Sequence, residues 1–76
     1  MMTQSEFMLE LETILNLSEG SLKSDSELAA FSEWDSLATF EVFSLLKKLE
    51  IPISFIQIDN FRTVNDIIEL VKQKLT

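Results

Sequence analysis

The chain has 76 residues, a formal charge of −7 and neither cysteine nor histidine. Without cysteine it forms no disulfide and has no thiolate nucleophile, and without histidine it lacks the commonest general base and metal ligand near neutral pH. Its composition, 46% hydrophobic with one glycine and one proline, favours a compact helical fold over a disordered or β-rich one. We therefore expect a single domain over residues 1–76 that is not an enzyme and holds no metal ion.

A first helix is predicted to begin after Thr3. Thr3 and Glu6 have the spacing of a capping box, in which each side chain bonds to the backbone N–H of the other residue. The apolar residues that follow recur at spacings of four and three: Phe7, Leu11, Ile14 and Leu15. This pattern predicts an amphipathic helix of about four turns that ends near residues 17–20, where Gly20 can adopt a left-handed conformation.

Residues 20–35 form a long loop in this interpretation, because they are rich in serine and carboxylates and show no sustained period. A few apolar side chains are predicted to pin this loop to the core: Leu22, Leu28, Ala29 and Phe31. A structureless connection of about 15 residues is unusual in so small a domain and tends to carry function. Trp34, the only tryptophan, is predicted to be a large buried anchor that fixes the loop before Ser36. The carboxylates of the loop do not have the spacing of a calcium-binding loop.

A second helix is predicted from about Ser36 to Leu49, since Pro52 forces the residue before it into an extended conformation. On a helical wheel the core-facing arc holds Ala38, Val42, Leu45, Leu46 and Leu49, with Phe43 at its margin. Leu37 and Phe40 fall off this arc, beside Ser36. They either pack in a bundle that buries several helix faces or contact a partner, and their nearness to Ser36 favours the partner.

Two further helices complete the predicted fold. Residues 54–60 alternate weakly, but an isolated strand is unstable, so a short helical turn capped by Ser54 is preferred. Thr63 and Asp66 repeat the capping pattern before a last helix. Its apolar stripe is Val64, Ile67, Ile68, Val71 and Leu75. The predicted fold is all-α: a small four-helix bundle of three longer helices and one short helix, with a long loop between helices 1 and 2.

The negative charge is concentrated in the first part of the chain. Residues 1–46 hold nine carboxylates against one lysine, a net −8, whereas residues 47–76 hold four carboxylates and five basic residues. An acidic surface repels nucleic acid and anionic lipid and attracts positively charged proteins, although it also simply keeps small proteins soluble. The chain has no apolar run near the roughly 20 residues of a membrane span and no secretory signal pattern, so we expect a cytoplasmic monomer.

Ser36 has two explanations at this stage. It is a candidate N-cap of the second helix, because a serine oxygen can accept a hydrogen bond from the first helical turn. It also lies in the sequence Glu33-Trp34-Asp35-Ser36-Leu37, and with this motif and order of elements the chain resembles the acyl carrier proteins over nearly its whole length. In that family the serine of the Asp-Ser-Leu motif carries 4′-phosphopantetheine donated by coenzyme A. By this resemblance, Ser36 is the attachment residue.

The resemblance extends to other positions. Glu41 matches the acidic position after the motif, and residues 63–68 match the opening of the last helix. It implies that the chain carries an acyl group as a thioester and that Asp35, Leu37, Phe40 and Glu41 contribute to partner recognition. The implied partners are a phosphopantetheinyl transferase, an acyl-loading ligase or acyltransferase, and downstream biosynthetic enzymes. For Asp35 and Glu41 the alternative to partner recognition is that the carboxylate simply lies on a solvated face.

Two departures from the family pattern concern the second helix. Carriers of fatty acid synthesis have several carboxylates along it, whereas here Ala38 follows the motif and Lys47 and Lys48 replace acids near its end. Trp34 resembles a variant of some stand-alone carriers. We therefore expect partners that belong to one particular pathway. An aminoacyl or peptidyl carrier and an unmodified helical interaction module remain as alternatives.

Overall fold

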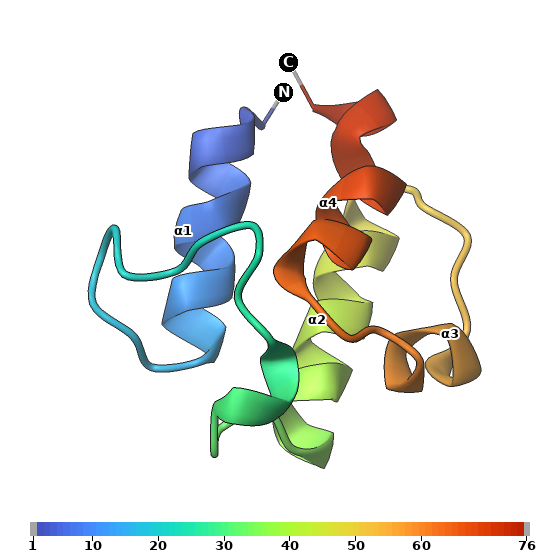
Figure 1. Cartoon of the computed structure of the whole chain (residues 1–76). Coiled ribbons are helices and arrows are strands. Elements are labelled where there is room, and N and C mark those ends of the chain that lie inside the picture. The colour runs from blue at the N-terminus through green and yellow to red at the C-terminus, as the bar shows by residue number, and fades with distance from the viewer. Residues whose placement is uncertain (1, 76) are drawn as a thin grey trace.

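The computed structural model describes residues 2–75 and is mostly helical, with no strand in that range (Figure 1). In chain order the elements are α1 (Gln4–Ile14), the 3-10 helix η1 (Leu28–Ala30), α2 (Ser36–Lys48), α3 (Phe55–Asp59), α4 (Val64–Val71) and the 3-10 helix η2 (Lys72–Lys74). Helix α1 packs against α2, and the short α3 also packs against α2. The predicted all-α fold, with three longer helices and a short one, is confirmed.

Three of the four helices begin at the N-cap residues expected from the sequence, and each of these starts is a capping box. In α1, α3 and α4 the N-cap side chain accepts from the third helical N–H, and the third side chain accepts from the N-cap N–H. The three pairs are Thr3 with Glu6, Ser54 with Gln57, and Thr63 with Asp66. These reciprocal bonds satisfy backbone donors that a helix start leaves unpaired.

The Asp66 box predicts a dependence of stability on pH. A backbone hydrogen bond from the Arg62 N–H lowers the pKa of Asp66 from its ordinary 3.8. Because the folded pKa is the lower one, this contribution to stability is present above pH 3.8 and is lost as the pH falls through the folded pKa. In thermal unfolding we expect the difference between wild type and Asp66→Asn, which keeps an acceptor oxygen, to close on acidification. A difference in thermal stability between wild type and Asp66→Asn that persists in acid would contradict this role of the Asp66 carboxylate.

The end of α1 differs from the prediction. The helix stops at Ile14, after about three turns, and Asn16 then takes the left-handed conformation at φ 58°. Asparagine tolerates this region because its side chain bonds locally. Gly20, at φ 85°, turns the chain only later. The predicted end at residues 17–20 was therefore wrong.

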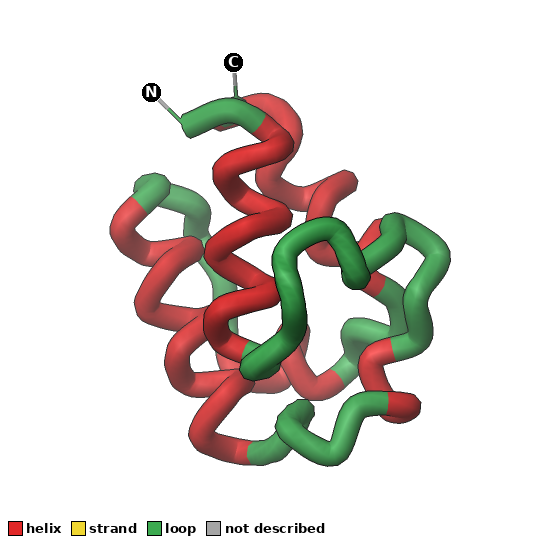
Figure 2. Tube along the Cα trace, turned by 90° about the vertical axis from the view of Figure 1, so that its left-hand side faces the viewer, coloured by secondary structure: helices red, strands yellow, loops and turns green. Residues whose placement is uncertain are grey.

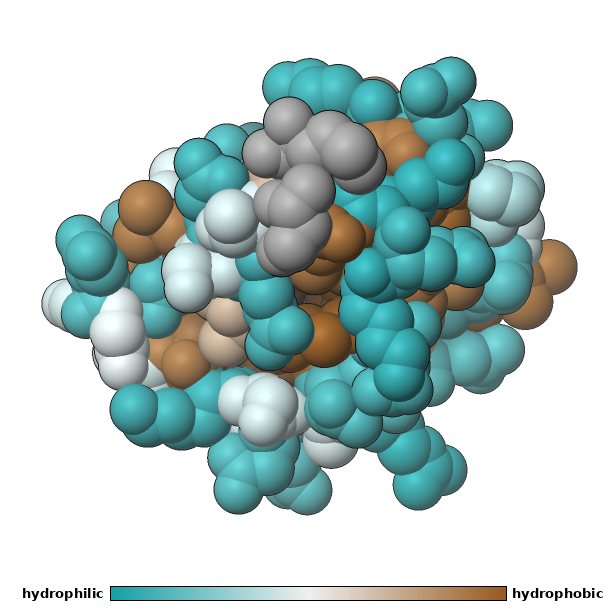
Figure 3. Space-filling view, turned by 90° about the horizontal axis from the view of Figure 1, so that it is seen from above, coloured by the Kyte–Doolittle hydropathy of each residue, from teal (hydrophilic) through white to brown (hydrophobic). Residues whose placement is uncertain are grey.

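The core is formed by apolar side chains from all four helices and from the segments between them. The buried apolar residues are Phe7, Leu11, Leu15, Leu22, Leu28, Ala38, Val42, Leu45, Leu46, Ile51, Ile53, Ile58, Val64, Ile67, Ile68 and Val71. They include most of the predicted arc of α2, whose last member, Leu49, is half-buried. Seen from above, hydrophilic side chains cover most of the surface, with hydrophobic ones between them (Figure 3).

Residues 15–35, between α1 and α2, are held at several points and are not structureless. This segment contains η1 and lies as a green tube over the helices in Figure 2. The Leu28 N–H donates to the Arg62 carbonyl at 2.8 Å, and the Ser26 carbonyl accepts from the Val64 N–H at 3.0 Å. The second half of the segment is therefore fixed to the start of α4.

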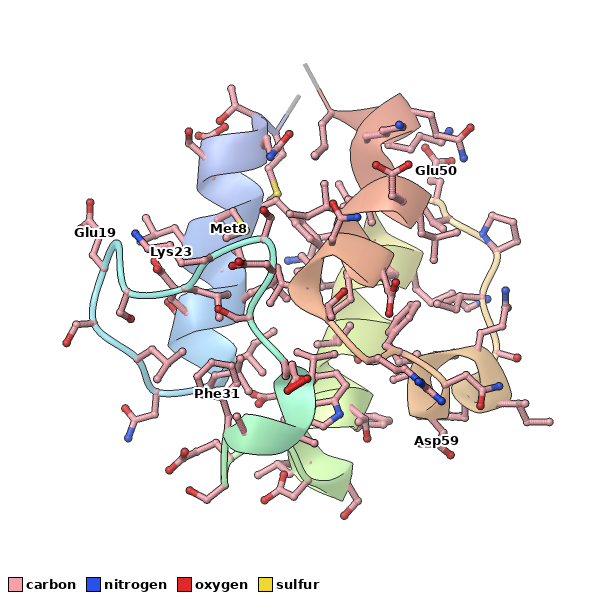
Figure 4. All side chains as sticks on the ribbon, viewed as in Figure 1. Met8, Glu19, Lys23, Phe31, Glu50 and Asp59 are labelled. Carbon is pink, nitrogen blue, oxygen red and sulfur yellow. The ribbon has the colours of Figure 1, made fainter. Side chains whose placement is uncertain are left out.

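Glu12 holds the first half of the same segment. It is 4% exposed, and its Oε2 accepts from the N–H groups of Gly20 at 2.9 Å and Leu22 at 3.0 Å. Glu19 and Lys23 project from the segment beside α1 (Figure 4). The predicted apolar stripe of this helix does not include Glu12, so its burial was not foreseen.

Replacing Glu12 by alanine is expected to lower the free energy of unfolding by about 1–3 kcal/mol, because the buried Leu22 N–H loses its acceptor. Glu12→Gln keeps an acceptor oxygen and should lose less, since only the charge assistance disappears. Urea denaturation measures both. Glu10→Ala, an exposed change on the same helix, is the control and should stay within about 0.5 kcal/mol of wild type. Equal stabilities of Glu12→Ala and wild type would contradict this account.

Candidate functional site

Asp35, and not Ser36, is the N-cap of α2. Its backbone is extended, at φ −125° and ψ −170°, and its Oδ1 accepts from the Ala38 N–H at 3.0 Å. A carboxylate is a strong N-cap because it both satisfies a free N–H and lies at the positive end of the helix dipole. The prediction that Ser36 caps the helix was therefore wrong. The capping role of Asp35 was missed, and its role in partner recognition stays a prediction.

Ser36 is the first residue of α2 and is exposed. Its carbonyl accepts from the Thr39 hydroxyl at 2.9 Å, but within residues 2–75 no hydrogen bond engages its own hydroxyl. The N–H groups of Ser36 and Leu37 likewise have no acceptor in this range, as expected at a helix start. The site thus combines an unengaged hydroxyl with two backbone donors.

The two apolar neighbours of Ser36 on α2 lie outside the core. Leu37 is 67% exposed and Phe40 is 54% exposed, as the helical wheel predicted. Glu41 is exposed as well and lines a hollow of about 270 Å³. The other residues around this hollow are Glu10, Ile14, Phe40, Ser44, Leu45 and Lys48. Contact of these side chains with a partner stays a prediction.

The sequence patterns missed a stack of aromatic rings next to this surface. The ring of Phe55, on α3, lies 4.3 Å from that of Phe43 and 6.3 Å from that of Phe40, measured between centroids, and both pairs are nearly parallel. Beside Phe55, Ile56 is 74% exposed. One signal was available: a helix of one turn that buries Ile58 can bury only one side, so its other apolar residues lie at the surface.

Trp34 is half-buried against the core, so the prediction of a large buried anchor is only partly correct. Its backbone N–H donates to the Phe31 carbonyl at 3.1 Å. Its side chain borders a hollow of about 350 Å³ together with Phe61 and Arg62. Trp34 therefore joins the connecting segment to the start of α4, two residues before Ser36.

Two substitutions of Asp35 separate its capping role from recognition by an enzyme. Asp35→Ala is expected to cost about 1 kcal/mol of stability, because the Ala38 N–H loses its acceptor, whereas Asp35→Asn keeps a good cap and most of the stability. Urea denaturation measures this difference. If a phosphopantetheinyl transferase recognises the negative charge of Asp35, Asp35→Asn should still lower the rate at which the arm is attached. Equal losses of stability in the two variants would contradict the capping assignment.

No protein-family model, curated protein or solved structure matches this chain. The chemistry of the site therefore has to be argued from its own residues. Within the described residues 2–75, no group of three or more His, Cys, Asp or Glu residues is arranged to hold a metal ion. None of the helices in this range has both the length and the apolar character that crossing a membrane demands.

Proposed function

We propose that this chain is an acyl carrier protein whose 4′-phosphopantetheine arm is attached to Ser36. The observation that carries the proposal is the Ser36 hydroxyl: it is exposed, it has no hydrogen bond within residues 2–75, and it lies one residue after the cap of a 13-residue helix. Because Asp35 provides the cap, the hydroxyl is available for a covalent bond without loss of the helix start. The exposed Leu37 and Phe40 give a partner enzyme an apolar contact beside it.

The attachment step follows from coenzyme A as donor. The Ser36 oxygen attacks the phosphorus that carries pantetheine, the pyrophosphate P–O bond breaks, adenosine 3′,5′-bisphosphate leaves, and the serine proton passes to a base of the transferase. The phosphodiester formed is an anion at the N-terminus of α2, where free N–H groups and the helix dipole favour negative charge. The arm also brings a thiol to a chain without cysteine, and this thiol holds the acyl group as a thioester.

The partners of such a carrier supply all of its chemistry. A phosphopantetheinyl transferase adds the arm, a ligase or acyltransferase loads it, and downstream biosynthetic enzymes act on the thioester in the cytoplasm. The chain contributes neither histidine nor cysteine to these steps. An aminoacyl or peptidyl carrier uses the same arm. The class of acid that a ligase loads onto the thiol therefore distinguishes an acyl carrier from an aminoacyl or peptidyl carrier.

The proposal is tested by intact-mass spectrometry. The unmodified protein is incubated with coenzyme A, magnesium and a broad-specificity phosphopantetheinyl transferase, and its mass is expected to rise by a single phosphopantetheine. Fragmentation of the product should place the added mass on Ser36. A protein that stays unmodified with several transferases would overturn the proposal in favour of an unmodified interaction module.

A further inference from the structure

The large exposed apolar side chains gather on one part of the molecule. In the described range these are Leu9, Leu37, Phe40, Phe55 and Ile56, and all except Leu9 belong to α2 or α3. Together with the half-buried Phe43, the members on α2 and α3 are called the aromatic surface below: Leu37, Phe40, Phe43, Phe55 and Ile56. This surface begins one residue after Ser36 and continues across α3.

The aromatic surface is preorganised. Phe55 is stacked with Phe43 at an interplanar angle of 14° and with Phe40 at 11°, so residues of two helices support one another. Stacked rings lose little conformational freedom when a partner covers them. Clustered apolar groups on a small monomer mark an interaction site, and aromatic side chains dominate the binding energy of such sites.

Charges of both signs border the aromatic surface, and a lysine lies over one of the stacked rings. The Lys47 ammonium lies 5.7 Å from the centre of the Phe43 ring, and Lys48 follows it. The only carboxylate of α2, Glu41, borders a hollow together with Phe40 and Lys48 of α2 and Glu10 of α1. The only carboxylate of α3, Asp59, borders the hollow shared with Trp34 and Arg62. The ring stack is thus flanked by a cation in a protein whose net charge is −7.

We propose that the aromatic surface binds a partner protein through an apolar contact bordered by carboxylates, which pair with Lys47 and Lys48. The proposal rests on the proposed function in one respect: a partner bound here would reach the arm on Ser36. The argument for an acidic partner is charge complementarity, because a basic partner would bring like charges against Lys47. Lys47 at this surface disfavours the basic surfaces that the acidic first part of the chain attracts.

The probe is a pair of helical peptides with the same leucine and phenylalanine face, flanked by glutamate in one peptide and by lysine in the other. Binding to the full chain is followed by amide shifts in ¹H–¹⁵N NMR spectra. At low ionic strength the acidic peptide is expected to bind about fivefold tighter, with the largest shifts at the aromatic surface. The double variant Lys47→Glu, Lys48→Glu should reverse this preference. The matched control Lys72→Glu, Lys74→Glu, on η2, should keep it.

A second pair of variants tests the ring stack. Phe55→Ala removes the central ring and should weaken binding of the acidic peptide about tenfold. Leu9→Ala changes an exposed apolar residue of α1 and should leave binding unchanged. Circular dichroism checks that each variant is folded.

The proposal is overturned if neither peptide binds, if the lysine-flanked peptide binds equally or better, or if the shifts map elsewhere. It is overturned also if sedimentation shows that a second copy of the chain covers the aromatic surface. Attachment of the arm is measured separately by mass. A chain that binds the acidic peptide but is never modified would therefore refute the carrier function and leave the acidic-partner proposal standing.

Discussion

Ser36→Ala is expected to abolish attachment of the phosphopantetheine arm while leaving the fold unchanged. The substitution removes the oxygen that forms the bond to phosphorus, so no added mass should appear after incubation with coenzyme A and a transferase. Stability should be kept, because Asp35 caps α2 and alanine is a good helix former at the position that follows. Intact-mass spectrometry and urea denaturation on the same sample measure the two effects.

The matched control is Ser44→Ala, which removes an exposed serine hydroxyl from the same helix two turns later. This variant should be modified at the wild-type rate. If Ser36→Ala still gained the arm, the attachment site would lie elsewhere. If Ser36→Ala lost the arm but also unfolded, the role of Asp35 as the cap of α2 would be wrong.

The helices could be predicted because their signals are local. A capping box joins residues three apart, and an apolar stripe repeats every three or four residues, so a sequence window shorter than one helix contains both. This explains why the starts at Thr3, Ser54 and Thr63 were placed correctly. It also explains why α2 was placed well although its cap was not, since Asp35 and Ser36 are adjacent and both residue types favour that position.

The burial of Leu22 and Leu28 agrees with the predicted pinning of the connection between α1 and α2, but its hydrogen bonds could not be predicted because they are not local. The Glu12 carboxylate bonds to N–H groups eight and ten residues later, and Ser26 and Leu28 pair with residues at the start of α4. Such bonds leave no period in the sequence. The serines and carboxylates of this segment read as a solvated loop, whereas its backbone is fixed just before the residues that lead to Ser36.

Only part of the aromatic surface could be predicted from the sequence, because its remaining contacts are not local either. Leu37 and Phe40 lie on a long helix, where a wheel separates the buried face from the exposed one. Phe55 lies on a helix of five residues, which is too short to show a period, so its stacking between two rings of α2 depended on the tertiary structure. The helix that begins at Ser36 and the exposure of Leu37 and Phe40 were therefore predicted, whereas the extension of the surface across α3 was not. The role of Ser36 stays a prediction.

Two substitutions of leucine by alanine on α2 are expected to separate folding from function. Leu46 is fully buried in the core, and Leu46→Ala should lower the free energy of unfolding by about 2–5 kcal/mol through lost burial and the cavity left behind. Leu37 is 67% exposed, and Leu37→Ala should change it by no more than about 0.5 kcal/mol. Since small domains are stable by only about 5–15 kcal/mol, Leu46→Ala removes a large share of the total.

Urea denaturation followed by the fluorescence of Trp34, the only tryptophan, measures both variants in the same way. In the transferase assay Leu37→Ala, and not Leu46→Ala, should have the larger effect. Leu37→Ala should slow attachment of the arm, because it removes an apolar contact next to Ser36, whereas Leu46→Ala should be modified normally while it stays folded. Equal destabilisation by the two variants would contradict the assignment of Leu37 to the surface. Normal modification of Leu37→Ala would instead show that the transferase does not use this side chain, and would leave it to the partners that act after the arm is in place.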